Sequence, residues 1–244
     1  MPSSSKLPIP PLVVGDTVVV QVECQGDSFA AGLDTATGEN RWRVDRPKAA
    51  NWVSPAAIRN ADGTAAALLQ SADGLTAHDS KTGKELWKYD ASCAGIASLT
   101  TSGDHIFLPA NGLTVLESPG GASTPKLLWE SNKLSPGNAS PVIDGERVYV
   151  LNRVGVLACA NAQTGETLWQ TRLKGTFWAT PVIAGGYAYC ANQDGECLVV
   201  KLGEKGELVH TAAFTEPFFG TPAAAGGALY LRSEKSLWKI AEPK

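Results

Sequence analysis

The stretch Asn161-Ala162-Gln163-Thr164-Gly165-Glu166-Thr167-Leu168-Trp169 decides the fold, because it recurs along the chain. Two close copies precede it, residues 34–42 and 79–87, and in each copy the tryptophan follows the glycine by four residues. Residues 125–129 and 206–210 are degenerate copies, with Pro125 in the glycine position and His210 in the tryptophan position. The tryptophan positions are 42, 87, 129, 169 and 210, spaced by 45, 42, 40 and 41 residues. Self-similarity at such a period is typical of repeat architectures.

A second signature marks the start of each repeat. Pro141-Val142-Ile143-Asp144-Gly145 is a short apolar run between a proline and a glycine turn. Similar runs begin at Pro11, Pro55, Pro181 and Pro222, and Leu99 takes the proline position in the third repeat. The starts near 11, 55, 99, 141, 181 and 222 therefore define six units.

The sequence pattern of each unit predicts a set of short β-strands. Alternating and β-branched runs such as Arg147–Val150 and Val156–Ala160 are separated by glycine turns, and none shows sustained helical periodicity. The side chain of Asp or Asn can cap the Asp-x-x-Thr-Gly turn, and glycine can adopt the positive φ that the turn requires. Four strands in about 40–45 residues is the period of a propeller blade. The sequence therefore predicts an all-β chain with almost no helix, forming a single propeller domain over residues 1–244.

The sixth unit, Thr221–Lys244, has room for only three strands. Residues 1–10 contain Pro2, Pro8 and Pro10 and would make a poor replacement for its outer strand. Two interpretations follow, an imperfectly closed propeller of about six repeats or a fragment of a seven- or eight-bladed one. The first is favoured, and the second would leave sheet edges exposed.

Composition excludes several classes of function. The net charge of −3, without a cluster of basic residues, argues against a nucleic-acid or anionic membrane partner. No run approaches the ~20 apolar residues of a transmembrane helix, and Met1–Pro11 does not have the pattern of a signal peptide. The histidines His78, His105 and His210 occupy different repeat positions. We therefore expect no catalytic residue and no metal ligand.

The five cysteines, an odd number, do not form the Cys-x-x-Cys pairs of a zinc site. Cys190 and Cys197 flank a predicted turn and could face each other across a hairpin. Buried free thiols are the favoured interpretation, and a disulfide between these two residues is the alternative.

The aromatic residues fall into two groups. Even spacing predicts that one repeat tryptophan packs between neighbouring sheets in each blade, which makes these residues structural: Trp42, Trp87, Trp129 and Trp169. A second set lies where one blade leads into the next, and we predict that it forms a binding rim with neighbouring loop residues: Trp52, Asn138, Trp178, Phe218, Phe219 and Arg153. The alternative is that these rings plug the central channel of a small propeller.

The unit Pro-Val-x-x-x-Gly-x-Val-Tyr-Val, followed by Asn/Asp-x-x-Thr-Gly-Glu-x-x-Trp, resembles the pyrroloquinoline-quinone-like, or quinoprotein-type, β-propeller repeat family. The resemblance implies either a BamB-like binding scaffold or a quinone-dependent dehydrogenase that uses pyrroloquinoline quinone and calcium. Such enzymes hold the quinone against a ring of two adjacent cysteines, and this chain has no adjacent cysteines.

A non-catalytic scaffold with a protein or peptide partner and no cofactor is therefore favoured, with a quinone-dependent enzyme, or a fragment of one, as the alternative. The family implies a periplasmic or extracellular location, whereas the N-terminus leaves a cytoplasmic one open.

Overall fold

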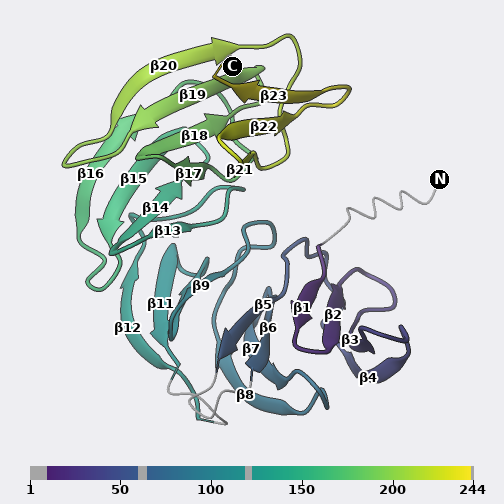
Figure 1. The fold of residues 1–244 in the computed structure, drawn as a ribbon. Coiled ribbons are helices and arrows are strands. Elements are labelled where there is room, and N and C mark those ends of the chain that lie inside the picture. Colours follow the sequence, from purple (N-terminus) through teal and green to yellow (C-terminus); the bar gives the residue numbers. More distant parts are fainter. Residues whose placement is uncertain (1–9, 60–64, 119–122, 243–244) are drawn as a thin grey trace. The chain divides into compact units, whose positions relative to one another are not determined.

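The computed structural model describes residues 10–59, 65–118 and 123–242. Over these residues the chain contains only strands, turns and connections, and no helix. Six antiparallel sheets follow one another, each built from strands in sequence order, so each repeat forms one sheet (Figure 1). The predicted all-β propeller class, with six repeats, is confirmed. The described residues include no helix long and apolar enough to span a bilayer.

The strands of the first three sheets are short and separated by tight turns. Their bounds are β1 Leu12–Val14, β2 Thr17–Val22, β3 Phe29–Asp34 and β4 Asn40–Asp45; β5 Ala56–Arg59, β6 Ala65–Ser71, β7 Gly74–Asp79 and β8 Glu85–Asp90; and β9 Thr100–Ser102, β10 His105–Leu108, β11 Leu113–Glu117 and β12 Lys126–Ser131.

The remaining sheets repeat the pattern. Their strands are β13 Val142–Asp144, β14 Arg147–Leu151, β15 Val156–Asn161 and β16 Thr167–Arg172; β17 Val182–Ala184, β18 Tyr187–Ala191, β19 Glu196–Lys201 and β20 Glu207–Ala213; and β21 Ala223–Ala225, β22 Ala228–Arg232 and β23 Leu237–Ala241. The sixth sheet has three strands where the other five have four, as the sequence predicts. The expectation for residues 1–9 lies outside the described residues.

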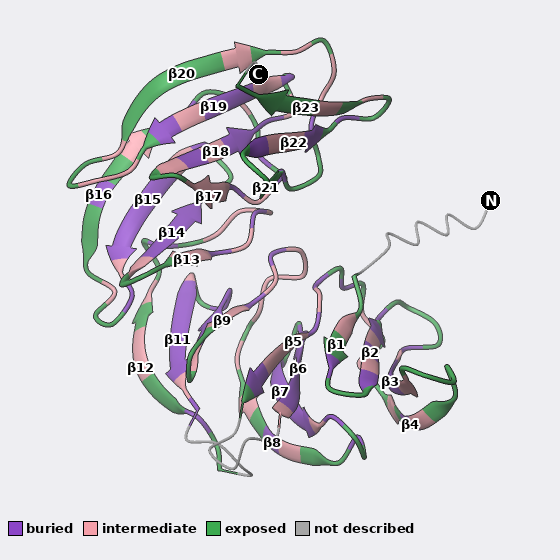
Figure 2. Ribbon diagram, in the orientation of Figure 1, coloured by how far each residue is buried: buried purple, intermediate pink, exposed green. Residues whose placement is uncertain are grey.

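The chain divides into two compact units, residues 1–128 and 129–244, which are described separately. In both units the middle strands β6, β7, β14 and β15 are largely buried, whereas at least half of the positions in the outer strands β4, β16 and β20 are exposed (Figure 2). Because side chains alternate across a strand, each middle strand presents apolar side chains to both faces of its sheet. The core therefore lies between successive sheets.

Each Asp-x-x-Thr-Gly turn is capped as the sequence predicts. The Asp34 carboxylate accepts hydrogen bonds from the backbone N–H groups of Ala36 (2.8 Å) and Thr37 (3.0 Å), and Asp79 and Asn161 do the same in their turns. The glycines have φ of +75° at Gly38, +71° at Gly83 and +73° at Gly165. A hydrogen bond from Arg41, together with those from the turn, lowers the pKa of Asp34 to about 2.

The repeat tryptophans join one sheet to the next. The indole N–H of Trp42 donates to the Ser80 carbonyl (2.9 Å), and its ring covers Gly83, where a Cβ would lie 2.6 Å from Cδ2. Trp129 donates to the Ala162 carbonyl (3.0 Å) and covers Gly165. In the next repeat Trp169 donates to the Gly203 carbonyl (3.2 Å) and covers Gly206. Each of these rings therefore packs on the glycine turn of the following repeat.

The register of the fifth sheet separates two cysteines that the sequence could have paired. Cys197 lies opposite Ala191, and Cys190 lies opposite Leu198, so the two side chains are on opposite faces of the sheet. Cys190 packs in the core with Trp169 and Leu198, whereas Cys197 packs with Phe218 and Leu231. The alternative, in which they face each other across the hairpin and form a disulfide, is wrong. The favoured interpretation of free thiols is confirmed for all five cysteines, although Cys24 is exposed and Cys93 is only partly buried.

A thiol titration of the native protein is expected to show one fast-reacting cysteine, Cys24, which is exposed. Burial raises the pKa of Cys93 to about 12 and that of Cys197 to about 11, and it raises the pKa of Cys190 as well. Because the thiolate is the reactive form, these thiols should react only when the protein unfolds. The measurement is reaction with an aromatic disulfide reagent, and a fast phase that survives in Cys24→Ser would contradict the prediction.

Candidate functional site

A repeated hydrogen bond fixes the loops that carry the predicted rim. Ser140 N–H donates to the Thr180 hydroxyl (2.9 Å), and Thr180 N–H donates to the Thr221 hydroxyl (3.3 Å). In the first unit Ser54 N–H donates in the same way to the Ser98 hydroxyl (2.9 Å). The rim residues Trp52, Asn138, Trp178 and Phe219 each lie two positions before one of these tied residues. Their loops are therefore held to the adjacent repeat.

Trp178 and Phe219 form an exposed aromatic pair in the second unit. Their ring centroids are 6.5 Å apart at an interplanar angle of 74°, which is the favoured edge-to-face geometry. Trp178 is 39% exposed and Phe219 is 46% exposed. The structure thus brings together two of the predicted rim residues, from loops that lie 41 positions apart in the sequence.

Phe218 does not share this surface. It is fully buried and packs edge-on against Phe214, with ring centroids 5.1 Å apart. Its backbone forms an isolated bridge with Ser233, the residue directly after β22. Phe218 therefore belongs to the core between the fifth and sixth sheets, and its neighbour Phe219 is the exposed residue.

The other predicted rim residues lie on loops of their own unit. Arg153 and Val154 occupy the exposed turn between β14 and β15, and Asn138 is partly buried in the loop before β13. In the first unit Trp52 is 37% exposed, and its backbone N–H donates to the Gly95 carbonyl (2.9 Å). Trp52 directly follows Asn51, and the Asn51 side chain belongs to a buried polar cluster that the sequence did not predict.

A buried carboxylate lies at the centre of that cluster. Glu23 follows β2, and its side chain is only 1% exposed. Its Oε1 atom accepts from the Arg46 guanidinium (2.8 Å) and the Ser71 hydroxyl (2.6 Å), and Oε2 accepts from the Asn51 amide (2.8 Å). Burying a charge is costly unless it is paired and hydrogen-bonded, and Glu23 satisfies both conditions.

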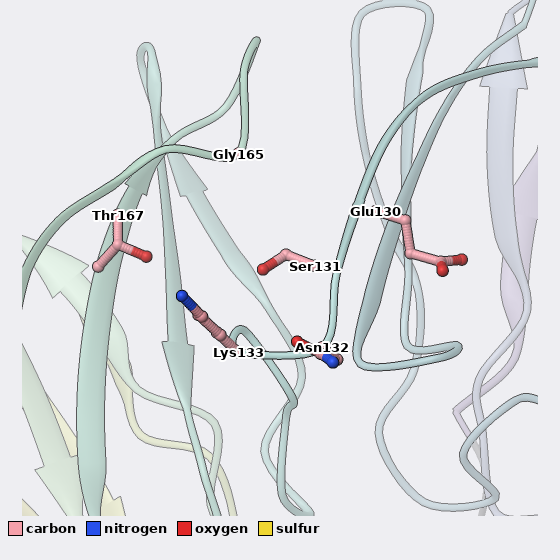
Figure 3. Close-up of a pocket in the computed structure, with 6 residues that line it drawn as sticks. All are labelled: Glu130, Ser131, Asn132, Lys133, Gly165 and Thr167. Carbon is pink, nitrogen blue, oxygen red and sulfur yellow. The ribbon is translucent and has the colours of Figure 1, made fainter.

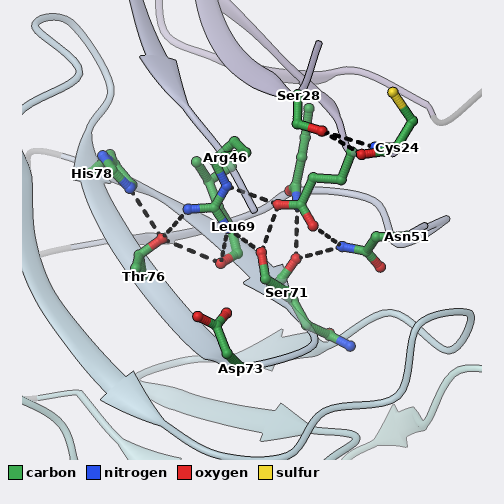
Figure 4. Close-up of polar contacts among 12 residues, drawn as sticks. Cys24, Ser28, Arg46, Asn51, Leu69, Ser71, Asp73, Thr76 and His78 are labelled. Atoms are coloured by element: carbon green, nitrogen blue, oxygen red, sulfur yellow. Dashed lines mark hydrogen bonds and ion pairs between the residues drawn. The ribbon is translucent and has the colours of Figure 1, made fainter. Parts of the chain in front are cut away.

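Arg46 extends the cluster into the second sheet. The guanidinium lies between Ser71 and Thr76, donating to their hydroxyls at 2.5 and 2.8 Å (Figure 4). The His78 ring lies 3.0 Å from the Thr76 hydroxyl and 3.0 Å from the Gly83 carbonyl. Burial lowers the pKa of His78 below its ordinary value. The buried imidazole is therefore a structural part of the cluster.

Two amide side chains complete the cluster. Gln21 and Asn51 both donate to the Gln70 carbonyl, at 2.7 and 2.8 Å, and Gln70 in turn holds the loop before β9 through the Ala94 and Ala97 carbonyls. The cluster therefore fixes the backbone at Asn51, and with it the position of Trp52. The sequence signal is that Gln21 and Glu23 continue the inward-facing alternation of Thr17 and Val19.

The described residues offer no clustered set of acidic side chains for a calcium ion of the kind that the quinone-dependent enzymes of this repeat family use. Calcium takes six to eight oxygen ligands, usually including several carboxylates. No group of three His, Cys, Asp or Glu side chains in the described ranges is placed to hold a metal ion. Both Glu23 oxygens are already occupied by protein donors.

A polar hollow lies in the second unit, beside the end of β12 and the start of β16. It is lined by Glu130, Ser131, Asn132, Lys133, Gly165 and Thr167. The Lys133 amine and the Thr167 hydroxyl point into it, while the Glu130 carboxylate points away (Figure 3). None of the predicted rim residues lines this hollow.

The fold is similar to that of a solved propeller. The crystal structure of BamB from Moraxella catarrhalis matches with a TM-score of 0.75 and 20% sequence identity, covering 94% of this chain and 70% of that one. No protein with a curated function matches the sequence.

The sequence itself matches the profile of one protein family. That profile is described as outer membrane protein assembly factor BamB, and it covers residues 2–106 and 121–211. The match spans most of the chain and includes the repeats that contain Trp42, Trp87 and Trp169. This chain therefore belongs to the BamB family of quinoprotein-type β-propeller repeat proteins.

Proposed function

We propose that the chain is a non-catalytic scaffold that binds a protein or peptide segment on its aromatic loops. The observation that carries the proposal is the exposed pair of Trp178 and Phe219, whose rings meet edge-to-face at 6.5 Å. Large aromatic side chains on rigid supports are typical anchors of protein interfaces, because they bury much area at a low cost in conformational entropy.

Exposed groups on another loop of the second unit also favour a peptide ligand. Val154 is 62% exposed, and Arg153 beside it offers a fixed fork of N–H donors. The Thr180 and Thr221 hydroxyls tie the two aromatic loops to neighbouring repeats, so little ordering is required on binding. Trp52, held by the Glu23 cluster, gives the first unit a comparable exposed anchor.

The description of the family supports the proposed kind of partner and the proposed location. Its description names an outer membrane protein assembly factor, and a role in protein assembly favours a protein partner. A periplasmic or extracellular location is part of the proposal on the same ground.

Substituting Trp178 with Ala is expected to lower the affinity for a bound peptide by about 30-fold. This change corresponds to the ~2 kcal/mol that defines an interface hot spot. The probe is a peptide selected from a displayed random library on the immobilised chain, with its affinity measured by calorimetry. Leu168→Ala, at an exposed position on β16, is the matched control and should leave the affinity unchanged.

Two results would count against the proposal. The first is a selected peptide whose affinity is unchanged in both Trp178→Ala and Trp52→Ala. The second is calcium-dependent quenching of tryptophan fluorescence by pyrroloquinoline quinone that disappears in Trp178→Ala, which would point to a dehydrogenase instead.

A further inference from the structure

The turn between β18 and β19 is hydrogen-bonded to both loops that carry the exposed aromatic pair. Gln193 N–H donates to the Thr176 carbonyl (2.9 Å), two residues before Trp178. From the other loop, Phe218 N–H donates to the Asn192 carbonyl (3.0 Å), one residue before the second exposed ring. The turn therefore lies between the two aromatic loops, and all three segments belong to the second unit.

The Asn192 side chain holds this turn from the inside. Asn192 is fully buried, and its amide nitrogen donates to the Lys174 carbonyl (3.2 Å) and to the Glu196 carboxylate (3.0 Å). Its amide oxygen accepts from the backbone N–H groups of Asp194 (3.0 Å) and Glu196 (2.8 Å). Because the amide is hydrogen-bonded on both sides, the turn and the exposed Asp194 at its tip have a fixed position.

A carboxylate lies at the same point of each aromatic loop. Asp194 Oδ2 lies against Gly175, where a Cβ would be 2.7 Å from it. Gly175 precedes Trp178 by three residues, and Glu216 precedes Phe219 by three residues. The two acidic groups therefore accompany the two exposed rings. We call these four side chains the acidic aromatic site: Trp178, Phe219, Asp194 and Glu216.

The Glu216 carboxylate is held in its charged form. It accepts from the Ser233 hydroxyl (2.6 Å), the Ser236 hydroxyl (2.8 Å) and the backbone N–H of Lys235 (3.0 Å). These hydrogen bonds, that from Ser233 first, lower the pKa of Glu216 below its ordinary value. Its donors are neutral groups, so its negative charge is not cancelled by them.

The charge on the two loops and the turn is unbalanced. Residues 173–179, 192–196 and 214–220 carry three carboxylates and one amine: Asp194, Glu196, Glu216 and Lys174. Among the residues that the structure describes, none of these four side chains has an ion-pair partner within 4 Å. A cation placed here is attracted both by the carboxylates and by the face of an aromatic ring, whereas an anion is repelled.

We propose that the segment bound at the acidic aromatic site presents a lysine or arginine side chain to it. The cationic group lies over the Trp178 ring and faces the Asp194 carboxylate, and Glu216 adds to the attraction. This inference rests on the proposed function, because it specifies the chemistry of the partner that the same aromatic pair binds.

The test uses peptides selected from a displayed random library on the immobilised chain. Selected peptides are expected to contain arginine or lysine more often than the library does. A peptide with one arginine is then compared by calorimetry with its analogue in which citrulline replaces that arginine, since citrulline has nearly the same shape but no charge. The analogue is expected to bind about 10-fold more weakly, as the loss of a partly desolvated cation–π contact predicts.

The variant Asp194→Asn locates this effect on the protein. It should lower the affinity for the arginine peptide by about 5-fold and leave the affinity for the citrulline analogue unchanged. The Asp194 side chain accepts no hydrogen bond from another described residue, so the turn should keep its structure. Asp144→Asn is the matched control, because it makes the same charge change at an exposed position at the end of β13. It should leave both affinities unchanged.

The outcomes separate this inference from the proposed function. Peptides that depend on Trp178 or Trp52 but bind equally well as citrulline analogues, or contain no basic residue, would overturn the inference and leave the proposed function standing. Equal losses in Asp194→Asn and Asp144→Asn would also overturn it, since the effect would then be one of net charge. Peptides that bind unchanged in both Trp178→Ala and Trp52→Ala would contradict the proposed function as well.

Discussion

Replacing Arg46 with Met is expected to lower the free energy of unfolding by about 3–5 kcal/mol, the usual cost of leaving a buried charge without its partner. The Arg46 side chain is 6% exposed and that of Glu23 1%, so water cannot replace the lost guanidinium. The Ser71 and Thr76 hydroxyls would lose their donor as well. Urea unfolding followed by circular dichroism measures the change.

Two variants separate this effect from a general loss of charge. The double variant Glu23→Gln/Arg46→Met removes both charges and should recover much of the stability, since replacing both partners of a buried pair is often close to neutral. Lys88→Met breaks an exposed pair with Asp90 and should cost far less than Arg46→Met, because exposed ion pairs contribute little to stability. Equal losses in Arg46→Met and Lys88→Met would contradict the structural role of the cluster.

Replacing Trp169 with Ala is expected to cost about 3–5 kcal/mol, the range measured for truncating a large buried aromatic side chain. The ring packs against Tyr149, with centroids 5.9 Å apart, and fills the core between the fourth and fifth sheets together with Cys190 and Leu198. Its loss would leave a cavity over Gly206 and would leave Arg147 as the remaining side-chain donor to the Gly203 carbonyl.

A graded series tests the two parts of this contact. Trp169→Phe retains a ring but removes the indole N–H, so it should cost less than Ala and no less than the ~1 kcal/mol of one hydrogen bond. Trp178→Ala, at an exposed ring, should leave stability nearly unchanged. If Trp169→Ala and Trp178→Ala were equally stable, the assignment of Trp169 to the core would be wrong.

The sequence predicts those features that recur with the period of the repeat. The strands, the capped turns and the tryptophans appear several times, so the pattern averages over local variation. Even spacing predicts that Trp169 packs between neighbouring sheets, and its hydrogen bond to the Gly203 carbonyl of the next repeat agrees with this position.

Features that occur once escape this reasoning. Glu23, Arg46 and Asn51 come together only because β2, β4 and the loop after β4 meet at one end of a sheet. The neighbours Phe218 and Phe219 have nearly the same sequence context, yet one is buried and the other exposed. The direction of a side chain in such a loop depends on the backbone bridge to Ser233, which no local pattern reveals.

The contact between tryptophan and glycine has a direction, and this bears on how the chain is made. Trp42 is synthesised before Gly83, and Trp169 before Gly206. Each tryptophan is therefore already part of the nascent chain when the glycine turn that it covers is made. Domains made during synthesis tend to form from the N-terminus onward. His210 replaces the tryptophan that would serve the sixth repeat, so assembly of that repeat depends on Phe214, Phe218 and Trp238 instead.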